Sequence, residues 1–463
     1  MDDGLIPPGQ SGVTSDDLSP GRRRDAIRRL EAEHLDVLVI GGGVTGIGCA
    51  LDAASRGLTV AVVEQRDLAS GTSSRSSKLI HGGLRYLQQF EFGLVREALS
   101  ERNLLISRIA PHLIKKVDFL YPLQNLGERL YAGLGIALYD LMAIRGGNSL
   151  PHHKHLSHKQ VQSTAPGLSP HAHRGAIVYS DASVDDARYV VSVARTAAQF
   201  GALILTSTKV TDLISSGGRV CGAEVRCLES GRQLKVSCGT VVNATGAWSD
   251  DIEKFAGENT SRVRASKGVH LVIPRDRVDL ETALILRTSE SVLFIIPSDT
   301  HWIVGTTDSD WQLDRAHPAA SKADIDYLLA TVNQVVKRPL TIQDVVGVYV
   351  GLRPLLKGEA DKTSKLSREH AVTISTEGLV SISGGKYTTY RIMAADTIDA
   401  VGIDQGQTLP KSPTAGIPLI GAQDYQRVKG RASEISQKCG AQLADINHLI
   451  SRHGDRIDEV LNL

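Results

Sequence analysis

The sequence predicts an α/β fold that combines a Rossmann-like dinucleotide-binding domain, an antiparallel β-sheet domain and a partial set of C-terminal helices. Three observations predict it. A strand, a glycine turn, a helix and a second strand can be read from Asp36 to Glu64, alternating apolar segments lie between 263 and 350, and a polar helical pattern follows Pro410. With 463 residues the chain is too long for one ordinary core, so two or three domains are expected.

The first of these units carries the glycine spacing GxGxxG. The apolar run Val37 to Ile40 is short enough for a buried strand. Gly41, Gly43 and Gly46 then remove side chains that would obstruct the tight turn, the approach of a pyrophosphate and the packing of helix on strand. The second strand ends on Glu64, an acid that suits a pair of ribose hydroxyls. The sequence therefore predicts a dinucleotide site whose phosphates face a helix N-terminus.

Bulk composition narrows the class of protein. Hydrophobic content of 41% and charged content of 22% are those of a soluble globular protein, and a net charge of +1 gives no reason to expect nucleic acid as a partner. Five cysteines without a CxxC pair argue against a disulfide framework or a zinc site, and they fit a reducing cytoplasm. The N-terminal MDDG does not begin a secretory signal.

The apolar stretches fall short of the roughly 18 to 20 residues that cross a bilayer. The nearest, Ala132 to Ile144, is interrupted by Asp140 and fits either a core helix or a helix lying in the membrane interface. The basic run Arg22 to Arg24 fits a solvated helix face, with a membrane-surface or partner contact as the alternative. Histidines between 111 and 175 match no usual metal spacing, so we expect a solvent-exposed loop there and no metal site.

A loop of small polar residues follows the second strand, and basic residues cluster beside it. The loop reads SGTSSRSS from Ser70 to Ser77 and offers hydroxyl and N–H donors with little bulk, as expected where a large cofactor lies against backbone. Arg75, Lys78, His81 and Arg85 are close together in the sequence and suggest an anion pocket. The cofactor contacts expected from this region are Ser73, Ser74, Ser77 and Lys78.

Two later segments favour FAD over NAD. The strand from Thr240 ends in ATG at Gly246, as late strands beside the same cofactor often do, and no second GxGxxG unit follows for a pyridine nucleotide. The segment GGKYTTYR places a glycine pair before a helix N-terminus, which can stabilise the negative charge of a reduced flavin. The cofactor contacts expected here are Gly246, Gly384, Gly385, Lys386 and Thr388.

Other elements follow from periodicity. Helices are expected over 91–110, 190–200 and 322–336, and a hairpin turn at 215–218 between strand-like runs at 202–206 and 220–228. Alternating segments at 270–273, 291–296 and 302–304 predict an antiparallel sheet that floors the substrate domain. Arg353, between an apolar strand and a proline, fits either a surface ion pair or an arginine aimed at an anionic substrate.

Residues 35 to 463 closely resemble the FAD-dependent glycerol-3-phosphate dehydrogenases, the aerobic respiratory enzymes of glycerol metabolism. The resemblance rests on the ordered segments VIGGGVTGIG, TSSRSSKLIHGGLRYL, KGVH, GTTD, GLRP and GGKYTTYR. It implies a DAO/glutathione-reductase-type FAD domain, non-covalent FAD, and oxidation of sn-glycerol 3-phosphate to dihydroxyacetone phosphate with electrons passed to a membrane quinone. It also implies a cytoplasmic protein attached peripherally to the cytoplasmic membrane, often as a dimer.

The resemblance also implies where substrate and flavin lie. Positions near the substrate are matched by Arg85, Tyr86, Arg353 and Arg368, and positions near the flavin by His81, His270 and Lys386. Oxidising a secondary alcohol requires removal of the hydroxyl proton and delivery of hydride from C2 to flavin N5. Our hypothesis is that the arginines hold the phosphate dianion and that either His81 or His270 accepts the proton. His81, His270 and Arg353 are thus the candidate catalytic residues.

The expected domains are a polar tail at 1–34, an oxidoreductase region at 35–409 and a C-terminal helical domain at 410–463. Within the region, the FAD domain takes about 35–120, 175–262 and 345–409, and the substrate domain about 121–174 and 263–344. The last domain stops where relatives continue, so a fragment or a natural truncation is expected. The alternative functions are a glycerol-3-phosphate oxidase that produces hydrogen peroxide, and a truncated, non-catalytic flavin-binding or membrane-docking protein.

Overall fold

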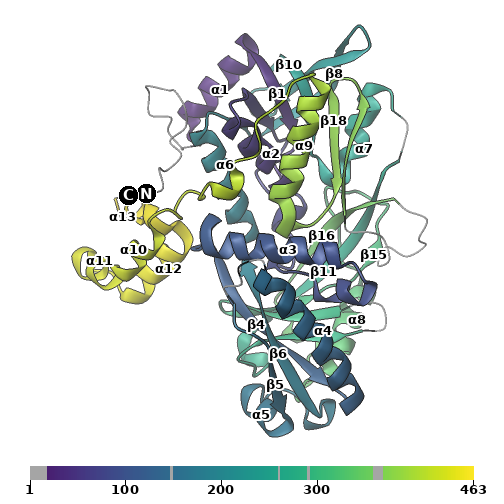
Figure 1. The fold of residues 1–463 in the computed structure, drawn as a ribbon, viewed down its shortest axis with the longest axis vertical. Coiled ribbons are helices and arrows are strands. Elements are labelled where there is room, and N and C mark those ends of the chain that lie inside the picture. The colour runs from purple at the N-terminus through teal and green to yellow at the C-terminus, as the bar shows by residue number, and fades with distance from the viewer. Residues whose placement is uncertain are drawn as a thin grey trace.

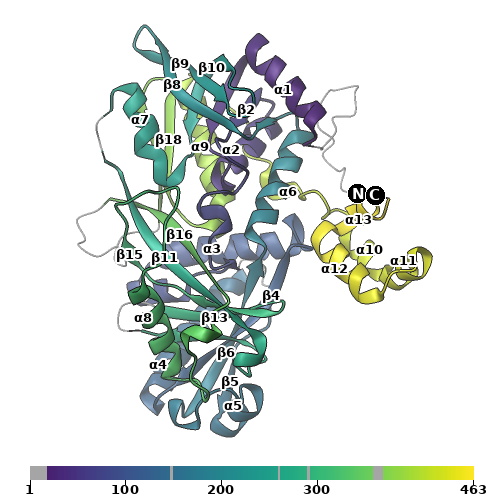
Figure 2. The ribbon, with the colours of Figure 1, turned by 180° about the vertical axis from the view of Figure 1, so that it is seen from behind.

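Two β-sheets form the body of the molecule, one above the other in Figure 1, and a group of short C-terminal helices projects from one side. Figure 2 shows the same arrangement from behind. The computed structural model describes residues 18–145, 147, 150–258, 261–288, 292–357 and 369–462. The chain passes repeatedly between the two sheets, so each contains segments that are far apart in the sequence.

The first sheet has five parallel strands at its centre, in the order β18-β10-β1-β2-β7, with antiparallel strands added at its margins. Residues 37–40 of β1 and Val60–Val63 of β2, at the middle of the sheet, are wholly apolar and buried because both faces of the sheet are covered there. The bounds are β1 (His34–Ile40), β2 (Val60–Val63), β7 (Leu203–Leu205), β8 (Thr208–Ser216), β9 (Arg219–Cys227), β10 (Gln233–Asn243), β17 (His370–Thr376) and β18 (Leu379–Gly384).

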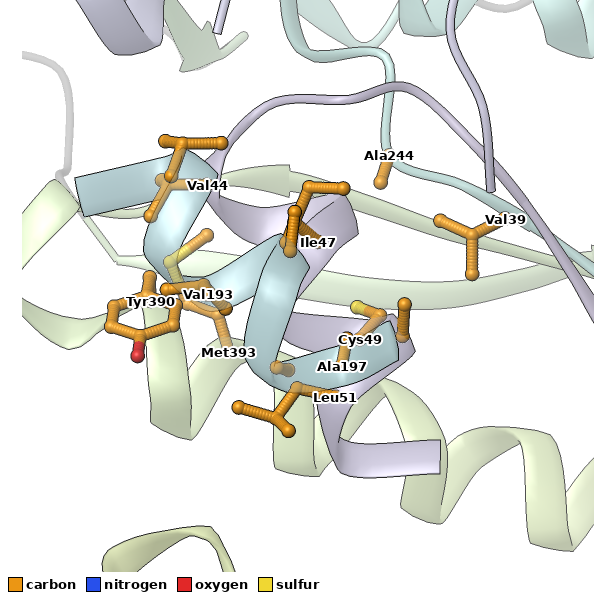
Figure 3. Packing of buried hydrophobic residues seen from close by; sticks show 14 of the residues in the cluster. Val39, Val44, Ile47, Cys49, Leu51, Val193, Ala197, Ala244, Tyr390 and Met393 are labelled. Atoms are coloured by element: carbon orange, nitrogen blue, oxygen red, sulfur yellow. The ribbon is translucent and has the colours of Figure 1, made fainter. Parts of the chain in front are cut away.

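One face of this sheet is covered by α2 (Val44–Ser55), which packs against α6 (Asp186–Gln199) and α9 (Tyr390–Asp404). Figure 3 shows Ile47, Val193 and Met393 from these helices in one buried cluster. The other face is covered by α1 (Pro20–Ala32) and the β8–β9 hairpin. Residues 20–32, expected within a polar tail, thus form a helix that buries Leu30 completely.

The second sheet has the order β15-β11-β14-β13-β12-β4-β6-β3, with β16 on β11 and β5 on β6. Its strands pair antiparallel except for β4 with β12, which confirms the antiparallel sheet predicted from the alternating segments. The bounds are β3 (Leu79–Ile80), β4 (Ile114–Leu123), β5 (Lys154–Ser157), β6 (Gly175–Val184), β11 (Val263–Pro274), β12 (Ala283–Arg287), β13 (Val292–Ser298), β14 (His301–Gly305), β15 (Ser309–Asp310) and β16 (Gly347–Leu356).

The remaining helices are α3 (Phe92–Leu104), α4 (Leu126–Arg145), α5 (His158–Thr164), α7 (Ser249–Glu253), α8 (Lys322–Asn333), α10 (Tyr425–Gly430), α11 (Ala432–Cys439), α12 (Leu443–His453) and α13 (Ile457–Leu461). Of these, α7 packs against β18 of the first sheet, and the others lie beside the second sheet or form the C-terminal group. Helices α10 to α13 pack around their own small core and confirm the predicted helical C-terminal region.

Several sequence predictions are confirmed and others are corrected. The helices expected at 91–110, 190–200 and 322–336 are present as α3 with a following π-helical turn, as α6 and as α8. The hairpin turn is confirmed, but its first strand is β8, which we did not predict; the run at 202–206 is β7 and pairs parallel with β2. The loop expected between 111 and 175 is wrong in part, because β4, α4, β5 and α5 lie there. The described residues contain no group of His, Cys, Asp and Glu suited to a metal ion.

The stretch 132–144 lies within α4. It is neither wholly a core helix nor wholly an exposed helix of the kind that lies in a membrane interface. One face of α4 buries Ile136 and Tyr139 against the second sheet. The opposite face exposes large apolar side chains, with Leu134 66% exposed. No helix in the described part of the chain is long and apolar enough to cross a membrane.

Candidate active site

A cavity of ≈730 Å³ lies where the two sheets meet, and residues from both sheets line it. Its volume falls within the roughly 300–1,000 Å³ typical of ligand and cofactor sites. The first sheet contributes the ends of β1, β2 and β18 and the residues that follow β10, and the second contributes β11, β16 and the residues that follow β14. Predicted residues that line it are Gly41, Gly43, Glu64, Ser73, Ser77, His81, Tyr86, Gly246, His270, Arg353, Gly384, Gly385 and Lys386.

The first glycine turn brings β1 into close contact with the end of β10. Gly41 has φ +113°, and a Cβ there would lie 2.7 Å from the carbonyl oxygen of Ala244. A Cβ on Gly46 would collide with the carbonyl oxygen of Gly41, so Gly46 acts in packing and does not line the cavity. Gly43 precedes the first residue of α2, whose N-terminus therefore opens toward the cavity.

The acid at the end of β2 is held beside this turn. Oε2 of Glu64 accepts a hydrogen bond from the Gly42 N–H at 2.8 Å, and Oε1 accepts one from the Arg66 N–H at 2.8 Å. Ser73 comes from another segment but lies beside the first residue of α2, where its Oγ accepts a hydrogen bond from the Val44 N–H at 3.0 Å. These contacts fix a carboxylate and a hydroxyl at the wall where a ribose and a phosphate are expected.

The second glycine turn lies at the end of β18 and faces the same cavity. Gly384 and Gly385 have φ values of +77° and +80°, a conformation that favours glycine. Lys386 follows, with its Nζ 3.8 Å from the centre of the Tyr86 ring. Thr388 does not line the cavity; its Oγ1 accepts from the His81 N–H at 3.2 Å and so links this turn to the HGG segment.

Two other predicted cofactor residues also lie outside the cavity lining. Ser74 is on a short 3-10 helix (Thr72–Ser74) and is not among the lining residues. Lys78, with φ +56°, directs its Nζ to Asp186 at 2.5 Å. An ion pair with a fully buried carboxylate accounts for the position of Lys78, and its sequence neighbours do not reveal that partner.

Arg353 on β16 presents its guanidinium to the cavity from the second sheet. Its Nη1 donates to the carbonyl oxygen of Thr307 at 3.2 Å and its Nη2 donates to Oγ1 of Thr306 at 3.1 Å. The group lies across Gly268, where a Cβ would come within 2.7 Å of Nη2. The side chain of Arg85 and the whole of Arg368 lie outside the described residues.

His270 on β11 is buried between Tyr349 and Ser77. Its ring stacks on Tyr349 at 4.7 Å and 10°, and its Nε2 is 2.9 Å from Oγ of Ser77. Burial, with the positive charges of Arg353 and Lys78, lowers the pKa of His270 to about 3. The ring is therefore neutral near pH 7 and accepts a proton poorly in this electrostatic setting. His81 also lines the cavity and is half-buried.

These residues fit a flavin dinucleotide. The two glycine turns leave room for backbone to approach a ligand, the α2 N-terminus opens toward the cavity and could receive phosphates, and Lys386 adds a cation to the lining. A groove of this kind, joining a Rossmann-like turn to a second sheet, matches a ligand that extends from one sheet to the other.

Comparison with known proteins agrees with this geometry. The profile of the "FAD dependent oxidoreductase" (DAO) family matches residues 36–391. The glycerol-3-phosphate dehydrogenase 2 of Mycobacterium bovis is 52% identical over 457 residues, covering 98% of this chain and 78% of that protein. The chain belongs to the FAD-dependent glycerol-3-phosphate dehydrogenase family. The predicted family, fold class, enzyme class and FAD cofactor are thereby confirmed.

Solved structures support the family assignment. The glycerol-3-phosphate dehydrogenase of Bacillus halodurans, solved in complex with FAD, superimposes with a TM-score of 0.78 at 31% identity, covering 97% of this chain and 80% of that one. The L-alpha-glycerophosphate oxidase of Mycoplasma pneumoniae has a TM-score of 0.63 at 20% identity, covering 83% of this chain and 98% of that one. The second comparison shows a shared fold.

Proposed function

We propose that this chain oxidises sn-glycerol 3-phosphate to dihydroxyacetone phosphate with bound FAD. The observation that carries the proposal is the pairing, across one cavity, of two glycine turns suited to a dinucleotide with the cationic side chains Arg353 and Lys386. Relatives at 52% identity and a structural neighbour at 31% identity are named as glycerol-3-phosphate dehydrogenases. FAD, when bound, supplies the nitrogen that accepts hydride from substrate C2.

Arg353 is proposed to hold the substrate phosphate. Its guanidinium is fixed by Thr306 and Thr307 at one edge, and a planar fork of donors can engage two phosphate oxygens at once. Arg85, Tyr86 and Arg368 are proposed as further substrate contacts on the basis of the sequence resemblance. The aromatic ring of Tyr86 lies beside Nζ of Lys386, which supports its place near the substrate.

His81 is the proposed proton acceptor, with His270 as a neutral hydrogen-bonding partner of the substrate. The low pKa of His270 makes its protonation unfavourable at pH 7, which leaves His81 as the candidate base. The backbone of His81 is hydrogen-bonded to Thr388, which holds His81 beside the second glycine turn. Replacing each histidine by asparagine tests this choice. A large loss of turnover for His270→Asn with little loss for His81→Asn contradicts it.

A membrane quinone is the proposed electron acceptor, with peripheral attachment through the exposed face of α4. This face and the neighbouring turn carry large exposed apolar side chains: Phe90, Leu130, Tyr131, Leu134, Leu138, Leu141 and Ile144. An amphipathic helix of this kind can lie in the membrane interface with its apolar face among the acyl chains. The same helix touches the cavity wall through Tyr139, so attachment there would place the flavin site near the membrane.

Bleaching of the flavin tests the oxidation. Purified FAD-loaded protein should lose its yellow colour when glycerol 3-phosphate is added without oxygen, and glycerol, which lacks the phosphate, should bleach it far more slowly. Recovery of colour on adding a soluble quinone supports a dehydrogenase, whereas rapid recovery with oxygen and release of peroxide supports an oxidase. Absence of bleaching by glycerol 3-phosphate contradicts the proposed function.

A further inference from the structure

The segment 76–83, called here the anchored segment, runs along the cavity wall between the serine loop and the HGG turn. Ser76, Ser77, His81 and Gly83 line the cavity. In the middle of the segment, β3 pairs with β6, where Leu79 is opposite Ser183 and Ile80 opposite Ala182. Two side chains that do not line the cavity, Asp186 and Tyr139, hold the two ends of the segment.

Asp186 holds the first end. Its Oδ2 accepts from Oγ of Ser76 at 2.7 Å, and its Oδ1 is 2.5 Å from Nζ of Lys78. The carbonyl oxygen of Asp186 also accepts from the hydroxyl of Tyr387 at 2.6 Å, beside the second glycine turn. This end is therefore tied to both cofactor loops.

Tyr139 of α4 holds the second end. Its hydroxyl oxygen accepts from the Gly82 N–H at 2.9 Å and lies 2.9 Å from each carboxylate oxygen of Asp181. Asp181 in turn pairs with Nη1 of Arg102 at 2.6 Å, with both side chains almost fully buried. Gly82 fits closely, because a Cβ there would come within 2.5 Å of Leu99 and 2.6 Å of the Tyr139 hydroxyl.

Each hydrogen bond of the Tyr139 hydroxyl has a defined donor and acceptor. Burial, followed by the charge of Asp181, raises the pKa of Tyr139 well above its ordinary value, so the hydroxyl keeps its proton. It has one proton to give, and the carboxylate of Asp181, which is paired with Arg102, is the stronger acceptor. The lone pairs of the hydroxyl then remain for the Gly82 N–H, which fixes the direction of that peptide.

We propose that Tyr139 is a positioning residue: oriented by Asp181, its hydroxyl holds the Gly82 peptide and thereby sets the places of His81 and Gly83 in the cavity. A buried ion pair is costly compared with an apolar core of the same shape, so the almost fully buried pair of Asp181 and Arg102 suits a role in fixing geometry better than a role in stability alone. The inference rests on the proposed function, because His81 is the proposed proton acceptor.

The test compares Tyr139→Phe with Tyr121→Phe in FAD-loaded protein. The control also removes a tyrosine hydroxyl that is hydrogen-bonded at α4, because the Tyr121 hydroxyl, on β4, donates to Glu128 of α4 at 2.9 Å. Tyr121 does not line the cavity. Anaerobic stopped-flow bleaching over a range of glycerol 3-phosphate concentrations separates the limiting rate of flavin reduction from the substrate dissociation constant. FAD content and melting temperature are measured alongside.

Tyr139→Phe should lower the limiting rate about tenfold or more, since misplacement of a reacting group by 1 Å can cost about 100-fold. The dissociation constant should change less than about threefold because Arg353 lies on β16, which pairs with β11 toward the opposite edge of the second sheet from β3. Tyr121→Phe should bleach as the wild type does. Equal limiting rates for Tyr139→Phe and wild type overturn the positioning role, and so does a Tyr139→Phe protein that loses FAD or unfolds. A wild-type chain that glycerol 3-phosphate does not bleach overturns the proposed function as well.

Discussion

A single methyl group at Gly268 should weaken substrate binding while leaving FAD in place. In Gly268→Ala the new Cβ would lie 2.7 Å from Nη2 and 2.8 Å from Nη1 of Arg353, and contacts under 3.0 Å are essentially never seen. The guanidinium ends a flexible side chain, so it can retreat cheaply. Its bonds to Thr306 and Thr307 are already 3.1 and 3.2 Å long, and a retreat to between 3.0 and 3.4 Å from the Cβ would disturb their alignment.

A hydrogen bond to a charged group contributes about 1.5–3 kcal/mol, and about 1.4 kcal/mol corresponds to a tenfold change in affinity. We therefore expect the KM for glycerol 3-phosphate to rise roughly tenfold, with unchanged FAD content and melting temperature. Gly347→Ala is the matched control: it adds the same methyl on the β11–β16 pair, but its Cβ would meet Val272 at an ordinary 3.5 Å. An unchanged KM for Gly268→Ala, or an equal rise for both variants, refutes the placement of Arg353 at the phosphate.

Three further outcomes are expected. Arg353→Lys keeps the charge but loses the fork, so KM should rise about 10- to 100-fold with little change in FAD content; an unchanged KM removes Arg353 from the phosphate site. Leu134→Glu should abolish co-sedimentation with phospholipid vesicles while anaerobic bleaching persists, whereas Ile403→Glu, on the 74% exposed Ile403 of α9, should sediment as wild type. Burial lowers the pKa of His112 from 6.5 to about 4, so the unfolded chain binds more protons below about pH 6.5. Stability should fall by about 2 kcal/mol between pH 7 and 5, and His112→Gln should flatten that part of the melting-temperature profile.

Local patterns explain why the sequence predicts the two glycine turns so well. Each turn needs glycine for a reason within a few residues of it: the left-handed φ of Gly41, Gly384 and Gly385, or the close approach of Gly46 to the turn itself. The flanking strands are buried on both faces, so they read as short apolar runs. The loop and turn residues between these apolar runs then mark where one element ends and the next begins.

Long-range contacts explain what the sequence does not reveal. The helix α1 looks polar because one side of it is basic, and its packing depends on Leu30 reaching a face of the first sheet. The sequence of β8 does not alternate strictly between apolar and polar residues, because Asp212 and Ser215 lie at register shifts in its pairing with β9. Arg102 and Asp181 are 79 positions apart, and no local pattern marks two such residues as a buried pair.

The histidines show the same limit in the candidate site itself. The sequence places His81 and His270 on equal terms, because both stand close to glycine, in HGG and KGVH, in segments that match positions near the flavin. What separates them is the stacking of His270 on Tyr349, its burial, and the cations that three-dimensional folding brings beside it. Protonation behaviour is a property of that surrounding, so it becomes available once the fold is known.

The charges around the cavity explain how a chain of net charge +1 can favour a dianionic substrate. Two buried acids at this cavity each face a cation: Asp181, which is among the lining residues, pairs with Arg102, and Asp186, which is not, pairs with Lys78. Each acid is thus offset by its own cation, and Arg353 and Lys386 are also among the lining residues. Removing Arg102 would therefore do more than break one ion pair: it would expose the substrate site to the charge of Asp181, and binding of the phosphate should weaken even though Arg102 does not touch the cavity.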